Sequence, residues 1–128
     1  MGTLAFAKYQ GLGNDFLVVD NRSTQSTPSC EELVDGVFVI AQALCDRRYG
    51  VGGDGVLSLT KPTTADAVAT MRVLNADGSE AEMCGNGLRC VAKFLAETSD
   101  DQPDSVLVDT GAGPLDCRLE WQEDVVVS

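Results

Sequence analysis

The sequence lacks histidine entirely among its 128 residues. This absence excludes Ser-His and Cys-His nucleophilic catalysis, the HExxH metalloproteases and the zinc deaminases, all of which depend on an imidazole. Any acid–base chemistry must therefore use other side chains.

Basic residues are also scarce. Nine Lys and Arg stand against twenty Asp and Glu, which gives a net charge of −11 and a pI near 4.1. Such a surface repels nucleic-acid phosphates and anionic lipids, so neither is expected as a partner. No apolar run approaches the roughly 20 residues needed to cross a bilayer, and the first residues do not resemble a secretory signal. These features predict a cytoplasmic protein with no membrane association.

The five cysteines form no CxxC pair and are odd in number. They are Cys30, Cys45, Cys84, Cys90 and Cys117. A disulfide scaffold is therefore not expected, and a reducing compartment would keep them as thiols. With 44% hydrophobic and 23% charged residues, the chain has the composition of a folded soluble protein with the length of one domain.

Hydrophobic periodicity predicts two helices and seven strands. Strands are expected at 4–9, 16–20, 56–59, 67–74, 105–109, 115–121 and 124–127, helices at 31–44 and 88–98, a turn at 10–15 and a long loop at 75–87. This order lacks regular βαβ alternation, so a mixed, mostly antiparallel sheet packed around a helix is favoured over a doubly wound one. Because the chain ends inside a strand-like run of valines, we expect it to be truncated.

The loop at 75–87 delivers Cys84 to the start of the second predicted helix. The helix macrodipole and the unpaired N–H groups of the first turn favour a thiolate there, and N–H groups beside Gly85 and Gly87 could hold a carboxylate. The alternative is an Asn86-Gly87 turn in which the cysteine is a small buried hydrophobe. The helical spacing after Gly87 and the density of glycine favour the reactive thiol.

The remaining candidate motifs have structural interpretations. The other four cysteines are expected to pack rather than react. Residues 50–55 match GxGxxG, but a helix precedes them and a strand follows, the reverse of a dinucleotide site. The acidic loop from residue 75 has the wrong spacing for calcium. These two motifs therefore predict neither a dinucleotide cofactor nor a calcium ion. Asn14 and Asn75 lie in predicted loops, where they could bind a polar ligand or cap a turn, and their spacing alone favours capping.

Three stretches together resemble the diaminopimelate epimerase family. They are KYQGLGNDF at 8–16, DRRYGVGGDG at 46–55 and NADGSEAEMCGNGLR at 75–89. The resemblance covers essentially the whole chain, but family members are longer and contain two similar domains. It implies an α/β fold of the α+β type, with a mostly antiparallel curved sheet wrapped around a central helix. Residues 1–128 would be the amino-terminal catalytic domain, with the second domain absent from this chain.

The activity implied by the resemblance is interconversion of LL- and meso-diaminopimelate in lysine and peptidoglycan biosynthesis, without pyridoxal phosphate or metal. Cys84 matches the catalytic cysteine of the first domain, usually the proton donor. Asn14, Asn75, Gly85 and Asn86 match substrate-contacting positions. Some members carry glutamine where this chain has Gly55, so no contact is transferred to that residue.

Inversion at a carbon requires a base on one face and an acid on the other, so two thiols must straddle the substrate. The second cysteine is expected from the second domain, and the isolated half is expected to be inactive. The predicted partners are an amino-acid substrate, the second domain and a second copy in a homodimer. Two alternatives stay open: a non-catalytic amino-acid-binding or protein-interaction domain, and an isomerase of another small acid. The latter ranks last because it would lack the Cys84 motif.

Overall fold

The computed structural model describes residues 6–11, 13–22, 33–34, 37–82, 84–121 and 125–127. In chain order the elements are β1 (Ala7–Gly11), β2 (Asn14–Asp20), β3 (Leu33–Val34), β4 (Val37–Phe38), α1 (Val39–Cys45), β5 (Gly55–Thr60), β6 (Ala69–Asn75), β7 (Glu80–Ala81), α2 (Gly85–Glu97), β8 (Ser105–Thr110), β9 (Gly113–Trp121) and β10 (Val125–Val127). No helix in this described part has the length and apolar character required to cross a bilayer.

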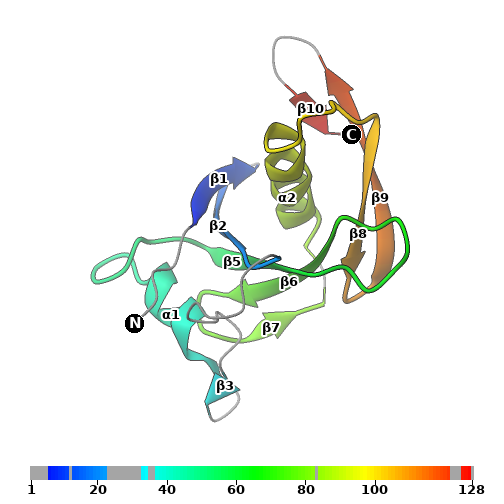
Figure 1. The fold of residues 1–128 in the computed structure, drawn as a ribbon. Helices are drawn as coiled ribbons and strands as arrows, with labels where there is room; N and C mark the ends of the chain where they lie inside the picture. Colours follow the sequence, from blue (N-terminus) through cyan, green and yellow to red (C-terminus); the bar gives the residue numbers. More distant parts are fainter. Residues whose placement is uncertain are drawn as a thin grey trace.

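Within the described residues, eight strands form one sheet in the order β1-β2-β5-β6-β8-β9-β10, and β7 pairs with β6. The β2–β5 and β6–β8 pairs are parallel, and the other neighbours are antiparallel. Figure 1 shows the sheet curving around α2, with β1 and β2 on one side of the helix and β8 to β10 on the other. The expected mixed, mostly antiparallel sheet around a central helix is confirmed.

The helix α2 is central because one of its faces is apolar and packs into the curve of the sheet. Its buried residues are Gly87, Cys90, Val91, Ala92, Leu95 and Ala96, a helical spacing. They share a core with inward-facing sheet residues that include Phe16, Val18, Leu57, Leu59, Met71 and Val73. The apolar face of α2 is therefore buried against β2, β5 and β6.

The other face of the sheet packs on α1. Leu17, Val19, Val56 and Leu74 form a second core with Ala41 and Cys45 of that helix. Strands β2 and β5 are thus covered on both faces, which explains their nearly continuous apolar sequences.

Strand β1, at the edge of the sheet, is attached to the carboxyl-terminal half of α2. The Tyr9 hydroxyl donates to Glu97 Oε1 at 2.6 Å. The Tyr9 ring lies edge-on to Phe94, with ring centroids 6.1 Å apart. An aromatic pair in this geometry adds to the stabilisation that comes from burial.

The predicted helix at 31–44 is wrong at 33–34 and 37–38, which are strands, while residues 31, 32, 35 and 36 lie outside the described residues. β3 pairs antiparallel with β4, and α1 begins only at Val39. The sequence carries the reason: Asp35-Gly36, between the two strands, is typical of a two-residue hairpin turn, and the valines beside it favour extended backbone. The helical spacing of apolar residues concealed this hairpin signal.

Several predicted element boundaries shift in the structure. The turn between β1 and β2 is reduced because β1 continues to Gly11 and β2 begins at Asn14, with Gly13 at a φ of 88° that suits glycine. β6 starts at Ala69 rather than residue 67, the loop at 75–87 contains β7, and α2 begins at Gly85 rather than residue 88. Asn14 and Asn75 therefore lie at strand ends and not in loops.

Candidate functional site

Cys84 is the N-cap of α2. Its backbone is extended, with φ of −139° and ψ of 117°, while its carbonyl already accepts the N–H of Leu88 at 2.8 Å. Its Sγ accepts a hydrogen bond from the Gly87 N–H at 3.4 Å. A side chain that accepts from the first helical turn performs the capping role usually filled by Ser, Thr or Asp. The sulfur is thus held beside N–H donors at the positive end of the helix.

Two glycines shape the space around this sulfur in different ways. An ideal Cβ on Gly87 would lie 2.8 Å from Leu57 Cδ2, so glycine permits close contact between the helix start and β5. A Cβ on Gly85 would have no neighbour within 4 Å. The backbone of Gly85 therefore borders open space, where a ligand can approach it.

Asn86, in the first turn of α2, is bonded directly to Asn14 at the start of β2. Asn86 Nδ2 donates to Asn14 Oδ1 at 3.0 Å, although the two residues are 72 positions apart. Four of the five predicted site residues are consequently joined: Cys84, Gly85 and Asn86 are consecutive, and Asn14 is bonded to the last of them.

Asn75 lies at the same end of the sheet but makes its own local contacts. Its Cα pairs with Gly55, which pairs in turn with Phe16, two residues after Asn14. Its Nδ2 donates to Ser79 Oγ at 3.0 Å, and its backbone N–H donates to the Ser79 carbonyl at 2.7 Å. The structure therefore places Asn75 near the predicted site while also giving it the capping role that its spacing favoured.

A charged network surrounds Asn14, and the sequence analysis assigned it no role. Asp54 Oδ2 accepts the Asp15 N–H at 2.8 Å, and Arg47 lies 3.3 Å from Asp54 Oδ1 and 3.4 Å from Asp15 Oδ2. The Asp15 N–H is the largest of the causes that lower the pKa of Asp54, and bonds from the Asn14 side chain and Arg47 contribute. Arg47 and Asp54 both lie in the motif at 46–55. This motif is the feature of the sequence that could have pointed to the charged network.

The other described cysteines are buried, as expected. Cys45, Cys90 and Cys117 are 4%, 4% and 5% exposed, whereas Cys84 is half-buried. Burial raises the pKa of all three buried thiols, that of Cys45 to about 11. Cys30 lies outside the described residues. Among the described cysteines, Cys84 alone combines partial exposure with a helix start.

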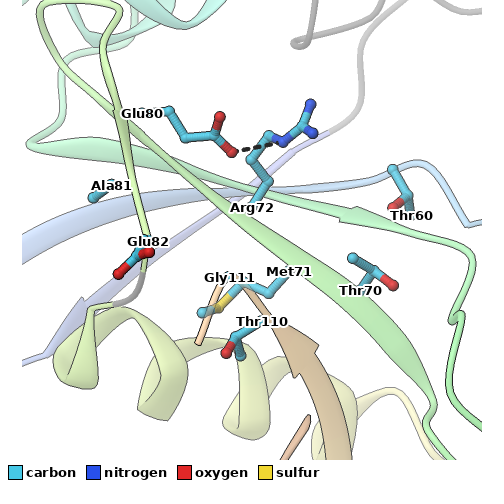
Figure 2. A pocket seen from close by; sticks show the side chains of 9 residues that line it. All are labelled: Thr60, Thr70, Met71, Arg72, Glu80, Ala81, Glu82, Thr110 and Gly111. Atoms are coloured by element: carbon cyan, nitrogen blue, oxygen red, sulfur yellow. Dashed lines mark ion pairs between the residues drawn. The ribbon is translucent and has the colours of Figure 1, made fainter. Parts of the chain in front are cut away.

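A cavity of about 410 Å³ lies beside β6, where β8 diverges from it (Figure 2). None of the five predicted site residues lines this cavity. Several of its polar groups already have partners: Arg72 is 2.7 Å from Glu80, and the hydroxyls of Thr110 and Thr70 donate to the carbonyls of Gly113 and Lys61. The cavity therefore offers less for ligand recognition than the start of α2.

The fold is shared with other proteins of solved structure. A hydroxyproline epimerase from Agrobacterium vitis, with bound trans-4-hydroxy-L-proline, matches with a TM-score of 0.71 and 16% identity, over 94% of this chain and 38% of that one. A phenazine biosynthesis protein of the PhzF family from Bacillus anthracis matches with a TM-score of 0.58 and 19% identity, over 92% and 35% of the two chains. The chain thus has the domain fold found in racemases, epimerases and PhzF proteins.

Sequence comparison defines the family. The sequence profile of diaminopimelate epimerase matches residues 6–128. The diaminopimelate epimerase of Rippkaea orientalis is 44% identical over 127 residues, and that of a Synechocystis species is 47% identical over 116 residues. The chain belongs to the diaminopimelate epimerase family. The match covers 98% of this chain but 42% of the Rippkaea protein, and 91% and 39% in the Synechocystis match.

Proposed function

We propose that the chain is the amino-terminal catalytic half of a diaminopimelate epimerase and supplies Cys84 as one of its two acid–base groups. The observation that carries this proposal is the position of Cys84: a half-buried sulfur that caps α2 beside the N–H of Gly87. Family membership supports the reaction class. The position of Cys84 as the N-cap puts its thiol next to a helix start, where N–H groups can bind an anion.

The proposed reaction is a two-base proton transfer at the α-carbon. One thiolate takes the α-proton as the C–H bond breaks, and the electron pair moves onto the α-carbon and its carboxylate. The thiol on the opposite face then gives its proton to the carbon and becomes a thiolate. Bonds and charges balance without an oxidant or a cofactor. Cys84 is the donor in one direction, and the second thiol comes from the second domain.

The helix start would stabilise the intermediate. Negative charge grows on the substrate carboxylate as the α-proton leaves, and N–H groups at Gly85 and Asn86 would be available to it in the first turn of α2. Asn14 and Asn75 would orient the rest of the amino acid. We place the enzyme in the cytoplasm, in lysine and peptidoglycan synthesis, with homodimer formation as a further proposal.

Isotope exchange tests the assignment of Cys84. The chain is joined to the remaining part of the Rippkaea orientalis relative, and deuterium incorporation from heavy water into diaminopimelate is measured by mass spectrometry. Cys84→Ser should lower α-proton exchange by roughly 10²-fold or more, the usual contribution of a general acid or base. Cys90→Ser, which changes a buried thiol on the same helix, should retain most of the exchange. Equal loss in both variants would refute the assignment.

A further inference from the structure

The turn between β8 and β9 touches the chain just before Cys84. Gly111 lies in this turn, and an ideal Cβ on it would be 2.5 Å from the carbonyl oxygen of Glu82, 3.0 Å from its Cα and 3.1 Å from its carbonyl carbon. All three are backbone atoms, so no side-chain rotation could make room for a methyl group. Glycine therefore allows two backbone segments that are distant in the sequence to meet at the edge of the cavity in Figure 2.

The turn that carries Gly111 is closed by the side chain beside it. Thr110 Oγ1 donates to the Gly113 carbonyl at 2.7 Å and accepts the Ala112 N–H at 3.1 Å. Thr110 also pairs with Gly113, the last pair between the two strands. A threonine that bonds to the backbone of its own turn restricts the conformation of that turn. Gly111 is therefore presented at a fixed place.

The other side of the contact is held by the sheet. Glu82 follows β7, in which Ala81 pairs with Val73 of β6 and packs against the core around α2. Glu82 precedes Cys84 by two positions, and successive Cα atoms are only about 3.8 Å apart. So short a connection cannot absorb a displacement of the Glu82 backbone, which would therefore be transmitted to Cys84.

We propose that Gly111 is a positioning residue: its close contact with the Glu82 backbone sets where the chain enters α2 and hence where the Cys84 sulfur lies. This inference rests on the proposed function, because the place of the sulfur matters for proton transfer to the substrate. An acid or base must lie within hydrogen-bond reach of the atom it serves, and a misplacement of about 1 Å can cost roughly 10²-fold in rate. The β8–β9 turn thus acts on the reaction through Cys84.

Amide NMR of the 128-residue chain tests this contact. The Gly87 N–H donates to Cys84 Sγ and the Leu88 N–H to the Cys84 carbonyl, so these two amide signals report on both acceptor atoms of Cys84. Gly111→Ala places a methyl group against the Glu82 backbone, and we expect it to shift both signals.

Ala112→Ser is the matched control, because it adds one heavy atom to an exposed neighbour in the same turn and should shift neither signal. Equal shifts in the two variants, or a shift in Gly111→Ala that stops at Glu82, would overturn the inference. If Gly111→Ala does not fold, Thr110→Val removes the hydroxyl that closes the turn without adding bulk at the contact. The Gly87 signal should then move as well, and an unchanged signal would equally overturn it.

Isotope exchange in the joined protein gives a second readout. Per folded molecule, as measured by circular dichroism, Gly111→Ala should lower α-proton exchange about tenfold, and Ala112→Ser should retain it. A loss of stability alone would lower exchange only in proportion to the folded fraction. Unchanged exchange in Gly111→Ala, in a protein where Cys84→Ser abolishes it, would overturn the positioning role. The amide signals need no turnover, so the two proposals can fail separately: unchanged signals refute the role of Gly111, and unchanged exchange in Cys84→Ser refutes the epimerase assignment.

Discussion

Asp109 shows how a single carboxylate can fix a loop. It is 5% exposed, and its Oδ2 accepts the N–H groups of Thr63 and Thr64 at 2.8 and 2.9 Å. The Thr64 side chain is the largest contributor to a pKa of about 2 for Asp109, below the ordinary 3.8, and these backbone bonds add to it. The ionised form is therefore stabilised by folding.

We predict that Asp109 contributes to acid unfolding. Because its folded pKa is depressed, its contribution to stability is complete above about pH 4 and is lost as the pH falls toward 2. Urea unfolding of the parent and of Asp109→Asn between pH 2 and 5 measures this contribution. The variant should be less stable than the parent at pH 5 and should show a weaker acid dependence. Asp116→Asn, an exposed neighbour on β9, is the control and should behave like the parent; the same slope in Asp109→Asn would contradict the prediction.

At the residue scale, the sequence predicts where a residue lies within an element better than it predicts which other residues its side chain contacts. The glycine-rich stretch before an apolar helix placed Cys84 at the helix start, and the structure has it there. The bond between Asn14 and Asn86 could not be predicted, since it depends on how β2 packs beside α2 across 72 positions. The contacts of Asp54 with Asp15 and Arg47 were not predicted for the same reason: a carboxylate in a loop has no recognisable partner until the fold brings one to it.

At the scale of the element, the first turn of α2 performs two separable tasks. Gly87 allows the helix to approach Leu57, whereas Gly85 borders open space. Packing and ligand access thus depend on different glycines within one turn.

We predict that alanine substitutions will separate these tasks. Gly87→Ala should lower the free energy of unfolding by about 1–3 kcal/mol, because its methyl group would crowd a fully buried leucine. Gly85→Ala should leave stability unchanged or raise it by up to about 1 kcal/mol, since alanine favours helix. In the joined, family-length protein, however, Gly85→Ala should weaken diaminopimelate binding. Urea unfolding and isotope exchange measure the two effects; equal destabilisation by both substitutions would contradict the assignment.

Elements with one dominant signal were predicted well, and the element with two competing signals was not. A short apolar run after a glycine-rich loop predicted β5 to within a residue at each end, and helical periodicity predicted the body of α2. The segment before α1 carries both helical spacing and the sequence Asp-Gly between valines, which is typical of a turn. The pairing of β3 with β4 favours the hairpin over the helix. This pairing depends on contacts between two strands, so the sequence of either strand alone does not reveal it.

At the scale of the whole molecule, Cys84 is the one candidate thiol among the described residues, whereas the proposed reaction needs two. It matches 42% of the length of its Rippkaea orientalis relative. The domain organisation, with the second thiol in a second domain, stays a prediction from the family resemblance.

We predict that the isolated chain does not epimerise diaminopimelate. A single thiol can reach one face of the α-carbon, so inversion has no donor on the other. Incubation of substrate with the chain alone in heavy water should give no α-deuterium above background, whereas the joined protein should incorporate it. Multiple turnovers by the isolated chain would show that Cys84 works with a donor from the same chain or from a second copy.

The attachment of the β1–β2 hairpin to both ends of α2 has a mechanical consequence. Tyr9 binds the hairpin near the last turn of the helix, and Asn14 binds it at the first. The hairpin and the helix should therefore shift as one rigid body. If an amino acid binds beside Cys84 as proposed, loosening the contact between Tyr9 and Phe94 at the far end of the helix should weaken that binding.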